Sequence, residues 1–464
     1  MHICLMNDSF PPQLDGVANA VKNYATLIQS GYGEASVVTP YYPDVEDDYP
    51  FPVIRYPSLD TTALVGYRAG VPFSPKALGE LEKLPVDLIH SHCPIVSTYL
   101  GRILRSRKKV PLVFTYHTKF DIDIANAIRG RHLQEGAVKL LVENITACDE
   151  VWVVSRGAGE NLRSLGYEGD YILMPNGVDL PRGRVAESAV REATAGFDLP
   201  RGTPVFLFVG RMMWYKGLRI ILDALQTLQS EGQDFRMVFI GAGGDEAEVR
   251  ACAGELGLSG RCLFVGPVYD RETLRAWYCR ADLFLFPSTF DTNGLVVREA
   301  AACSLASVLI RGSCAAEDGE DGENCFLIEE NSAAMAACLR ALCAQPQRMR
   351  QVGQRAAEEL YVSWEEAVRG AWERYAVVED RYRRGLCEPH NEPVDELLRS
   401  AGVIMDAAEK LRRARQLVTS RIDTLAAGLQ WEKQHKENER IAAREQNQLR
   451  QRAEGRWERL DRFL

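Results

Sequence analysis

Short apolar stretches recur along the first 310 residues, and each is followed by a polar turn or a helical pattern. Short apolar runs bounded by turn signals are typical of strands buried on both faces of a parallel sheet. Their alternation with helical patterns predicts an α/β fold built from doubly wound sheets. The predicted strands are HICLM, ASVVT, DLIHSH, PLVFTYH, EVWVVS and YILMPNG in the first set, and PVFLFVG, RMVFIG, CLFVG, DLFLFP and ASVLI in the second.

A linker rich in charged and small residues separates the two sets of predicted strands at about residues 180 to 203. At 464 residues the chain is too long for one hydrophobic core. We therefore expect two tandem Rossmann-like domains, at residues 1–180 and 190–362, followed by a helical extension at residues 388–464. Two such sheets place a ligand cleft between the carboxyl ends of their strands.

The stretch ADLFLFPSTFDTNGLVVREAAACSL contains a predicted strand, a loop and the start of a helix. The apolar run ends at Pro287, and the turn signal Asn293-Gly294 precedes a helix that begins at Leu295. Backbone N–H groups at the start of a helix have no partners within the helix, so they bind anions. We expect the N–H groups of Asn293, Gly294 and Leu295 to contact phosphate.

Two acidic residues border this predicted phosphate site, Asp291 in the loop and Glu299 in the helix. A carboxylate binds hydroxyl groups rather than phosphate, and it can accept from two vicinal hydroxyls at once. One acid beside a sugar and one beside a ribose, around a diphosphate, describe a nucleotide-sugar site. The alternative is a helix cap at Asp291 and a solvated helix acid at Glu299.

Two cations follow the first strand of the second domain. Arg211 comes directly after the strand, and Lys216 precedes Gly217 at the start of the next helix. A diphosphate carries about two negative charges, which these two cations and the helix start would neutralise. The sequence therefore predicts that Arg211 and Lys216 hold the diphosphate as it leaves.

Together these motifs resemble the retaining glycosyltransferases of family 4, which have the two-domain GT-B fold. The signature of that family is two glutamates separated by seven residues before a helix of small residues. The spacing of Asp291 and Glu299 matches it, and so do the Gly-Arg and Lys-Gly steps and the motif PNGVD at residues 175–179. The resemblance extends over about 385 residues, and the chain departs from the signature because its first acid is Asp291 rather than Glu.

The resemblance implies roles for two residues of the first domain. Gly16, at the start of a helix, would face the donor diphosphate, where a glycine permits close approach of the backbone; a plain turn is the alternative. His117, in a Thr-x-His-Thr pattern, would contact the donor sugar. A neutral imidazole can donate one hydrogen bond there, and a protonated one would stabilise negative charge. The resemblance also implies that a helix near residues 363–387 crosses back to the first domain.

Composition excludes several other functions. The formal net charge of −9 argues against nucleic-acid binding. Twelve cysteines without metal-ligand spacing predict free thiols in a reducing cytosol. Glu246 stands where a dinucleotide fingerprint beginning at Gly241 requires its third glycine, which argues against a nicotinamide-dependent oxidoreductase. By resemblance no metal is required, and the pair Asp121 and Asp123 is interpreted as loop or helix-cap chemistry.

Three segments are candidates for contact with lipid, although no apolar run reaches the ~18 residues of a membrane span and HICLM is a strand rather than a signal peptide. Residues 100–109 carry five cations among apolar positions, which favours either a basic helix for an anionic membrane or a solvated helix face. The irregular segment at residues 57–76 suits a partly apolar acceptor. The end of the extension, residues 450–464, predicts a weak interfacial anchor, with self-association, packing on the core or disorder as alternatives.

The sequence thus predicts a retaining hexosyltransferase that uses a nucleotide-sugar as co-substrate. By resemblance we expect UDP-glucose as donor and a lipid such as diacylglycerol as acceptor, for a protein in the cytoplasm or peripheral on the inner face of the membrane. A mannosyl or other hexosyl transferase acting on a soluble or phosphoinositide acceptor is the enzymatic alternative. A weakly active homologue with a scaffold role is the other, because of Asp291.

Overall fold

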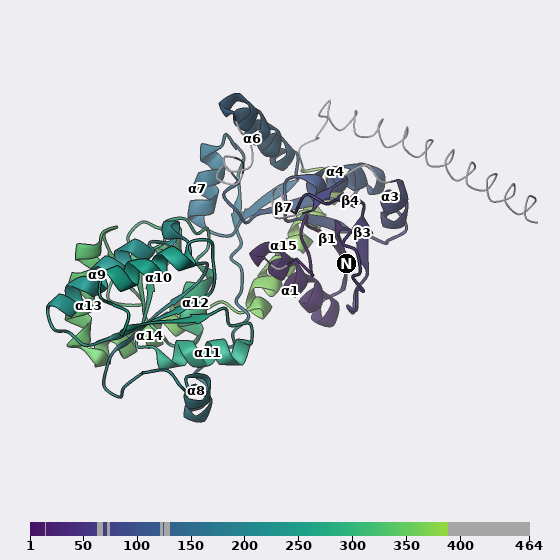
Figure 1. Cartoon of the computed structure of the whole chain (residues 1–464). Helices are drawn as coiled ribbons and strands as arrows, with labels where there is room; N and C mark the ends of the chain where they lie inside the picture. The colour runs from purple at the N-terminus through teal and green to yellow at the C-terminus, as the bar shows by residue number, and fades with distance from the viewer. Residues whose placement is uncertain (14, 63–67, 72–74, 121–123, 125–129, 388–464) are drawn as a thin grey trace, which may run out of the picture. The chain divides into compact units, whose positions relative to one another are not determined.

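The computed structural model of the chain describes residues 1–13, 15–62, 68–71, 75–120, 124 and 130–387 (Figure 1). In this part of the chain, two parallel sheets are each covered by helices, which confirms the predicted α/β class. The predicted extension at residues 388–464, the pair Asp121 and Asp123, and much of the apolar segment at residues 57–76 lie outside the described residues.

The first sheet has seven strands within the described residues, in the order β3-β2-β1-β6-β7-β8-β9, and all neighbours are parallel. Six of them were predicted from apolar runs; β3, in which Arg55 interrupts the pattern, was not. The strands are β1 His2–Met6, β2 Glu34–Pro40, β3 Val53–Tyr56, β6 Leu88–Ser91, β7 Leu112–Tyr116, β8 Glu150–Val153 and β9 Ile172–Leu173; a separate antiparallel pair joins β4 Ser58–Leu59 to β5 Ala69–Gly70.

The second sheet has six strands in the described part of the chain, in the order β12-β11-β10-β13-β14-β15. Five were predicted, and the short β15 was missed. The order reverses between β10 and β13, which is the point where open α/β sheets bind ligands beyond the carboxyl ends of their strands. The strands are β10 Val205–Val209, β11 Arg236–Ile240, β12 Cys262–Gly266, β13 Leu283–Phe286, β14 Ser307–Ile310 and β15 Phe326–Ile328.

Helices cover both faces of each sheet, as Figure 1 shows. With the first sheet pack α1 Gly16–Gly31, α3 Pro75–Leu81, α4 Val96–Lys108, α6 Arg131–Thr146, α7 Arg156–Ser164 and α15 Trp364–Arg383. With the second pack α8 Glu187–Ala193, α9 Leu218–Ser230, α10 Glu246–Glu255, α11 Arg271–Arg280, α12 Leu295–Ala302, α13 Ser332–Cys343 and α14 Pro346–Glu359, together with the 3₁₀ turns η1 Trp214–Lys216 and η2 Cys314–Ala316. In the described residues no helix is both long enough and apolar enough to cross a bilayer.

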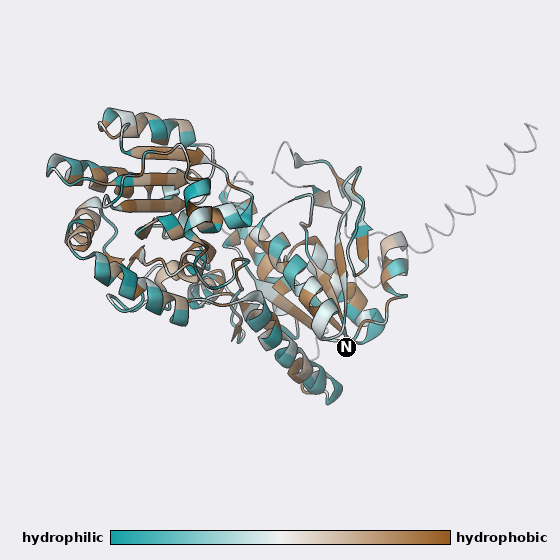
Figure 2. Cartoon of the chain, turned by 90° about the horizontal axis from the view of Figure 1, so that it is seen from below, coloured by the Kyte–Doolittle hydropathy of each residue, from teal (hydrophilic) through white to brown (hydrophobic). Residues whose placement is uncertain are grey.

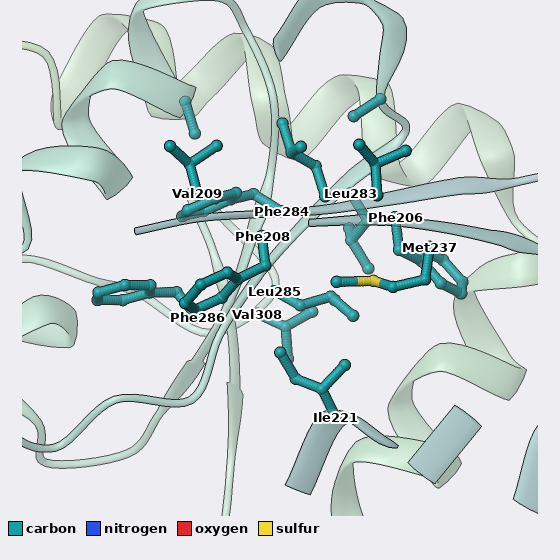
Figure 3. Close-up of a cluster of buried hydrophobic side chains, with 14 of the residues drawn as sticks. Phe206, Phe208, Val209, Ile221, Met237, Leu283, Phe284, Leu285, Phe286 and Val308 are labelled. Atoms are coloured by element: carbon teal, nitrogen blue, oxygen red, sulfur yellow. The ribbon is translucent and has the colours of Figure 1, made fainter. Parts of the chain in front are cut away.

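Aromatic side chains from adjacent strands fill the core of the second sheet. Phe208 and Phe286 lie with ring centroids 6.2 Å apart, and Phe284 and Phe286 are 5.7 Å apart (Figure 3). The strands are apolar on both faces, visible as brown arrows in Figure 2, because helices exclude water from each side. This explains why the strands appear in the sequence as continuous apolar runs rather than as alternating patterns.

The last described helix, α15, packs with the first sheet although it follows the second in sequence. Trp364, Val368 and Tyr375 belong to one buried cluster with Ile3 and Leu5 of β1. The Tyr375 hydroxyl lies 2.6 Å from Nδ1 of the buried His90. The helix thus closes a face of the first sheet that would otherwise be exposed.

The membrane-facing role considered for residues 100–109 is wrong for the helix that contains them. Arg102 and Arg105 are buried, and Arg102 Nη1 donates to Asn144 Oδ1 at 3.0 Å. Arg105 Nη1 donates to the carbonyl oxygen of Ala147 at 2.6 Å, and Lys108 Nζ donates to the carbonyl oxygen of Leu84 at 2.7 Å. These cations satisfy the protein's own carbonyl and amide oxygens, so neither a solvated face nor a membrane face results.

Two mid-helix glycines should respond oppositely to replacement by alanine. A Cβ at Gly353 of α14 would lie 2.3 Å from the carbonyl oxygen of Ser304, whereas one at Gly136 of α6 would meet nothing within 4 Å. We expect Gly353→Ala to lower the free energy of unfolding by ~1–3 kcal/mol through overpacking. Gly136→Ala should raise it by ~0.5–1 kcal/mol through backbone entropy. Thermal unfolding of the two variants measures both signs, and equal shifts would contradict the packing of α14.

Candidate active site

A partly buried ion pair lies at the carboxyl edge of the second sheet. Lys216 Nζ donates to Asp291 Oδ1 at 2.6 Å, although the two residues are 75 positions apart. Lys216 ends the turn η1 after β10, and Asp291 lies in the loop after β13, and these two strands are parallel neighbours. Ser288 Oγ donates to the other carboxylate oxygen of Asp291 at 2.6 Å. Two of the predicted site residues are thus in direct contact.

Gly217 makes this contact sterically possible. It adopts a left-handed conformation (φ +76°), and a Cβ there would lie 2.2 Å from the carbonyl oxygen of Pro287. The turn carrying Lys216 therefore packs directly on the end of β13. The Lys-Gly step in the sequence reflects this close approach of two backbones.

The ammonium group of Lys216 lies in a largely buried position beside aromatic rings. The side chain is 7% exposed, and burial lowers the pKa of Lys216, with Arg211 acting in the same direction and Asp291 opposing it. The ammonium nitrogen lies 5.6 Å from the ring centroid of Phe290 and 5.7 Å from that of Tyr215. Arg211 itself is exposed. A partly dehydrated ammonium among aromatic rings is suited to an additional anionic partner.

The loop between β13 and α12 presents an unpartnered amide. Asn293 is 8% exposed, and neither its side-chain nitrogen nor its side-chain oxygen has a partner among the described residues. Gly294, the N-cap of α12, has a left-handed backbone (φ +56°) and makes no side-chain cap, so no side chain caps the N–H groups of the helix start. Leu295 is the first residue of the helix. A buried polar group without a partner is costly, which indicates that a ligand or water completes the site.

His117 is held on both ring nitrogens by protein groups. Its Nε2 lies 2.9 Å from His92 Nδ1, and its Nδ1 lies 3.4 Å from the amide nitrogen of Asn176. Because an amide nitrogen donates, the proton of His117 is on Nε2 and points to His92. Burial lowers the pKa of His117 to about 3, so the ring is neutral at physiological pH. The predicted contact of His117 with a sugar stays a prediction, and the lowered pKa favours the neutral form of the ring for that contact.

The backbone of His117 contacts the loop between β13 and α12 directly. Thr292 Oγ1 donates to the carbonyl oxygen of His117 at 2.8 Å, and Ser155 Oγ donates to the carbonyl oxygen of Thr292. Thr292 lies between Asp291 and Asn293. His117 therefore lies next to the loop that carries Asp291 and Asn293.

The side chain of Glu299 is largely buried. It makes no direct hydrogen bond to Asp291 in the described structure. Its side chain is 13% exposed; Tyr278 Oη donates to Oε2 at 3.0 Å, and Arg271 Nη1 lies 3.4 Å from Oε1. Burial raises the pKa of Glu299, while Arg271 and Tyr278 oppose the shift. The alternative of a solvated helix acid is wrong for Glu299. The alternative of a helix cap is wrong for Asp291, which accepts from Lys216 and Ser288 instead.

Gly16 begins α1, where it is exposed and has open space around it. Asp15 already accepts from two N–H groups of this helix start, at 2.9 and 2.7 Å. The space beside Gly16 is compatible with a ligand, and its contact with a diphosphate stays a prediction. Sequence reasoning missed Ser288 and Phe290, although each stands within three positions of Asp291 and a search of its neighbours would have found them.

Comparison with known proteins assigns this arrangement to a class. Two tandem parallel sheets with a site at their strand ends match the GT-B fold of Anabaena HepE in complex with UDP, with a TM-score of 0.66 and 17% identity over 81% of this chain and 100% of that one. Sucrose-phosphate synthase from Thermosynechococcus elongatus matches with a TM-score of 0.64 and 22% identity over 81% of this chain and 98% of that one. The protein has the GT-B fold.

Sequence comparison defines the family within this fold. Profiles described as "Glycosyltransferase Family 4" and "Glycosyl transferases group 1" match residues 14–182 and 203–345. D-inositol 3-phosphate glycosyltransferase of Xylanimonas cellulosilytica is 32% identical over 62% of this chain and 72% of its own length. Alpha-monoglucosyldiacylglycerol synthase of Streptococcus pneumoniae is 24% identical over 65% and 69%, respectively. The chain belongs to glycosyltransferase family 4 and is a glycosyltransferase.

Lengthening the first acid of the site should impair the enzyme. Asp291→Glu adds one methylene to a carboxylate that already contacts Lys216 and Ser288 at 2.6 Å each, so it displaces both partners. We expect sugar transfer to fall by ~10–100-fold, because a misplacement of about 1 Å at a reacting centre has costs of this size. Initial rates at saturating donor measure this. A rate above that of the wild type would show instead that the native site is a degraded one.

The buried histidines should make the fold sensitive to acid. In the unfolded chain an imidazole binds a proton below about pH 6.5, whereas His117 in the folded chain stays neutral to about pH 3. The free energy of unfolding should therefore fall as pH decreases through this window, by up to about 1.4 kcal/mol per pH unit for this residue.

Replacing His117 should reduce the slope of stability against pH. Denaturant titrations between pH 7 and pH 5 compare the wild type, His117→Gln and the control His132→Gln, whose side chain is 99% exposed. The slope should be shallower only in His117→Gln. The same slope in all three proteins would show that His117 is not the group that titrates on unfolding.

Proposed function

We propose that this enzyme transfers a hexosyl group, with retention at the anomeric carbon, from a nucleoside-diphosphate sugar to a lipid hydroxyl. UDP-glucose is the proposed donor, and diacylglycerol or a related lipid is the proposed acceptor. The observation that carries the proposal is the partly buried contact of Lys216 with Asp291 beside the unpartnered amide of Asn293. A cation, a carboxylate and an open helix start within one loop cluster fit a phosphate next to a sugar.

Counting donors and acceptors assigns a role to each group of this cluster. An ammonium has three N–H donors, and Lys216 gives one of them to Asp291, which leaves two for diphosphate oxygens. Asp291 has about four acceptor sites, of which Lys216 and Ser288 use two, so two remain for sugar hydroxyls. The N–H groups at Asn293, Gly294 and Leu295 and the guanidinium of Arg211 complete the phosphate contacts.

The proposed reaction breaks the bond between the anomeric carbon and the diphosphate oxygen. Lys216, Arg211 and the start of α12 stabilise the negative charge that develops on the leaving diphosphate. The acceptor hydroxyl then bonds to the anomeric carbon from the same side, and its proton passes to the departing phosphate oxygen. No metal is required in this proposal, because protein cations and backbone N–H groups neutralise the diphosphate.

Two observations support a nucleotide-sugar donor and a lipid acceptor. HepE and its UDP and UDP-glucose complexes share the GT-B fold with this chain, and the synthase from Streptococcus pneumoniae is named for glucosyldiacylglycerol. The helix α6 exposes Leu133 and Leu140, at 67% and 56%. A groove of about 650 Å³ beside the same helix is lined by apolar Val138, Val142 and Leu165, together with polar side chains such as Glu135 and Lys139. Apolar surface of this kind suits a lipid.

The relatives also favour one specific alternative. D-inositol 3-phosphate glycosyltransferases are 26 to 32% identical to this chain, so a soluble phosphorylated polyol is the second candidate acceptor. A scaffold role remains the outcome if purified protein transfers no sugar to either acceptor.

The test is release of nucleoside diphosphate by the purified full-length chain. UDP-glucose and GDP-mannose are supplied separately, each with diacylglycerol-containing vesicles, with vesicles lacking diacylglycerol, or with inositol phosphate. We expect release from UDP-glucose that requires diacylglycerol. Release only with inositol phosphate would replace the lipid by the polyol, and release only from GDP-mannose would replace the donor.

A matched pair of lysine variants tests the site within the same assay. Lys216→Ala removes a charged hydrogen bond to the diphosphate, so turnover should fall roughly 10- to 100-fold. Lys83→Ala removes an exposed lysine of the first domain and should leave turnover unchanged. Equal activity of the two variants would remove Lys216 from the site.

A further inference from the structure

The carboxylate of Asp179 is the centre of a partly buried polar network. It lies in the PNGVD motif, between β9 and the second domain. Oδ1 accepts from Asn23 Nδ2 at 3.0 Å and from Trp364 Nε1 at 2.7 Å. Oδ2 accepts from Asn19 Nδ2 at 2.9 Å and from Arg271 Nη2 at 2.6 Å. These donors come from α1, α15 and α11, and they fill the approximately four acceptor sites of a carboxylate.

Arg271 connects Asp179, whose acceptor sites are all occupied, to Glu299, which has acceptor sites left over. Its Nη2 is fixed on Asp179, and its Nη1 lies 3.4 Å from Glu299 Oε1. A guanidinium presents its N–H groups in a rigid planar fork, so fixing one arm on Asp179 also fixes the direction of the other. The side chain of Arg271 is 49% exposed, which means that Asp179 rather than packing holds it in place.

Glu299 has acceptor capacity that the protein leaves unused. Arg271 approaches Oε1, and Tyr278 Oη donates to Oε2 at 3.0 Å. One donor on each oxygen leaves roughly one acceptor site per oxygen. Two such sites side by side match two vicinal hydroxyls, which is the geometry of a ribose. Asp179 has no acceptor sites left and therefore acts as a structural anchor, whereas Glu299 has sites left to bind a ligand.

We propose that Arg271 and Tyr278 are positioning residues that hold the Glu299 carboxylate oriented to accept from both ribose hydroxyls of the donor nucleotide. Asp179 acts one step further away, by fixing Arg271. Glu299 alone touches the ribose, so neither Arg271 nor Tyr278 is a catalytic residue. The inference rests on the proposed function, because it assumes that a nucleotide occupies the site.

The charges around Glu299 make these two partners necessary. The carboxyl group is buried, which raises the pKa of Glu299, and Asp179 adds to the shift while Arg271 and the Tyr278 hydroxyl oppose it. A protonated carboxyl group has one acceptor site fewer for a ribose hydroxyl. Removing either partner therefore weakens the ribose contact by two routes, loss of orientation and loss of charge.

The experiment compares binding of UDP with binding of 2′,3′-dideoxy-UDP to the full-length chain by calorimetry. Wild-type protein should bind UDP more tightly by roughly 10-fold or more, since each lost hydrogen bond to a charged group has an effect of this size. In Tyr278→Phe and Arg271→Gln this ratio should fall several-fold. The donor KM should rise more than kcat falls, and the loss should grow as the pH is lowered, because the pKa of Glu299 is raised.

Arg340→Gln serves as the matched control, since Arg340 pairs with Glu231 on the second domain and its side chain is 50% exposed. Its UDP to dideoxy-UDP ratio should equal that of the wild type. Wild-type ratios in both Tyr278→Phe and Arg271→Gln would overturn the inference, and so would a wild-type protein that binds both nucleotides equally. Failure of the wild type to bind either UDP or GDP would overturn the proposed function itself. Since Arg271 is half-exposed, its variant remains informative even if Tyr278→Phe is unstable.

Discussion

Parallel pairing of β10 with β13 is the constraint on which the candidate site depends. It places Phe206 beside Leu283 and Leu207 beside Phe284, so the two strands end at the same edge. The loops that follow therefore meet, although they are far apart in sequence. The close approach of Gly217 to Pro287 then brings a lysine and an aspartate together in a largely buried position. Without this strand order, Lys216 and Asp291 would not meet.

The ion pair of Lys216 and Asp291 has a desolvation cost that is relevant to ligand binding. Removing an ammonium and a carboxylate from water has a large desolvation cost, which a single contact only partly offsets. The aromatic rings of Tyr215 and Phe290 and the Ser288 hydroxyl add stabilisation around Lys216 and Asp291. The lowered pKa of Lys216 indicates that this compensation is incomplete. The anionic substrate proposed for this site would supply what is missing, and part of its binding free energy would then come from the environment that the fold imposes.

A second network, made of hydrogen bonds to Asp179, joins more distant parts of the chain. Asp179 lies in the segment that leads out of the first sheet. Asp179 accepts hydrogen bonds from helices on both sheets. One of these helices is α15, which follows the second sheet in sequence but packs with the first. Contacts of Thr292 with His117 and Ser155 bring the loop after β13 against the first domain. Groups that would bind a sugar and a ribose are thereby connected to the first domain by hydrogen bonds rather than by apolar packing alone.

The sequence by itself determined the strands, the two-domain organisation and the chemical type of the main groups. Apolar runs such as LFLF predicted buried strands because helices cover both faces, and the spacing of Asp291 and Glu299 followed from one continuous loop and helix. Local signals failed at β3, in which Arg55 interrupts the apolar pattern, at the short β15, and at α4, whose cations pair with oxygens of α6 and its C-cap.

Only the tertiary structure decided which groups act together. The partners of Lys216, Glu299 and His117 come from other elements of the chain, and their burial sets the pKa of each group. PNGVD was recognisable as a motif, but the role of Asp179 depends on side chains 156 and 185 positions away. Sequence specifies a residue's chemistry, whereas its protonation and its free acceptor sites depend on neighbours that only the packed strands and helices bring close.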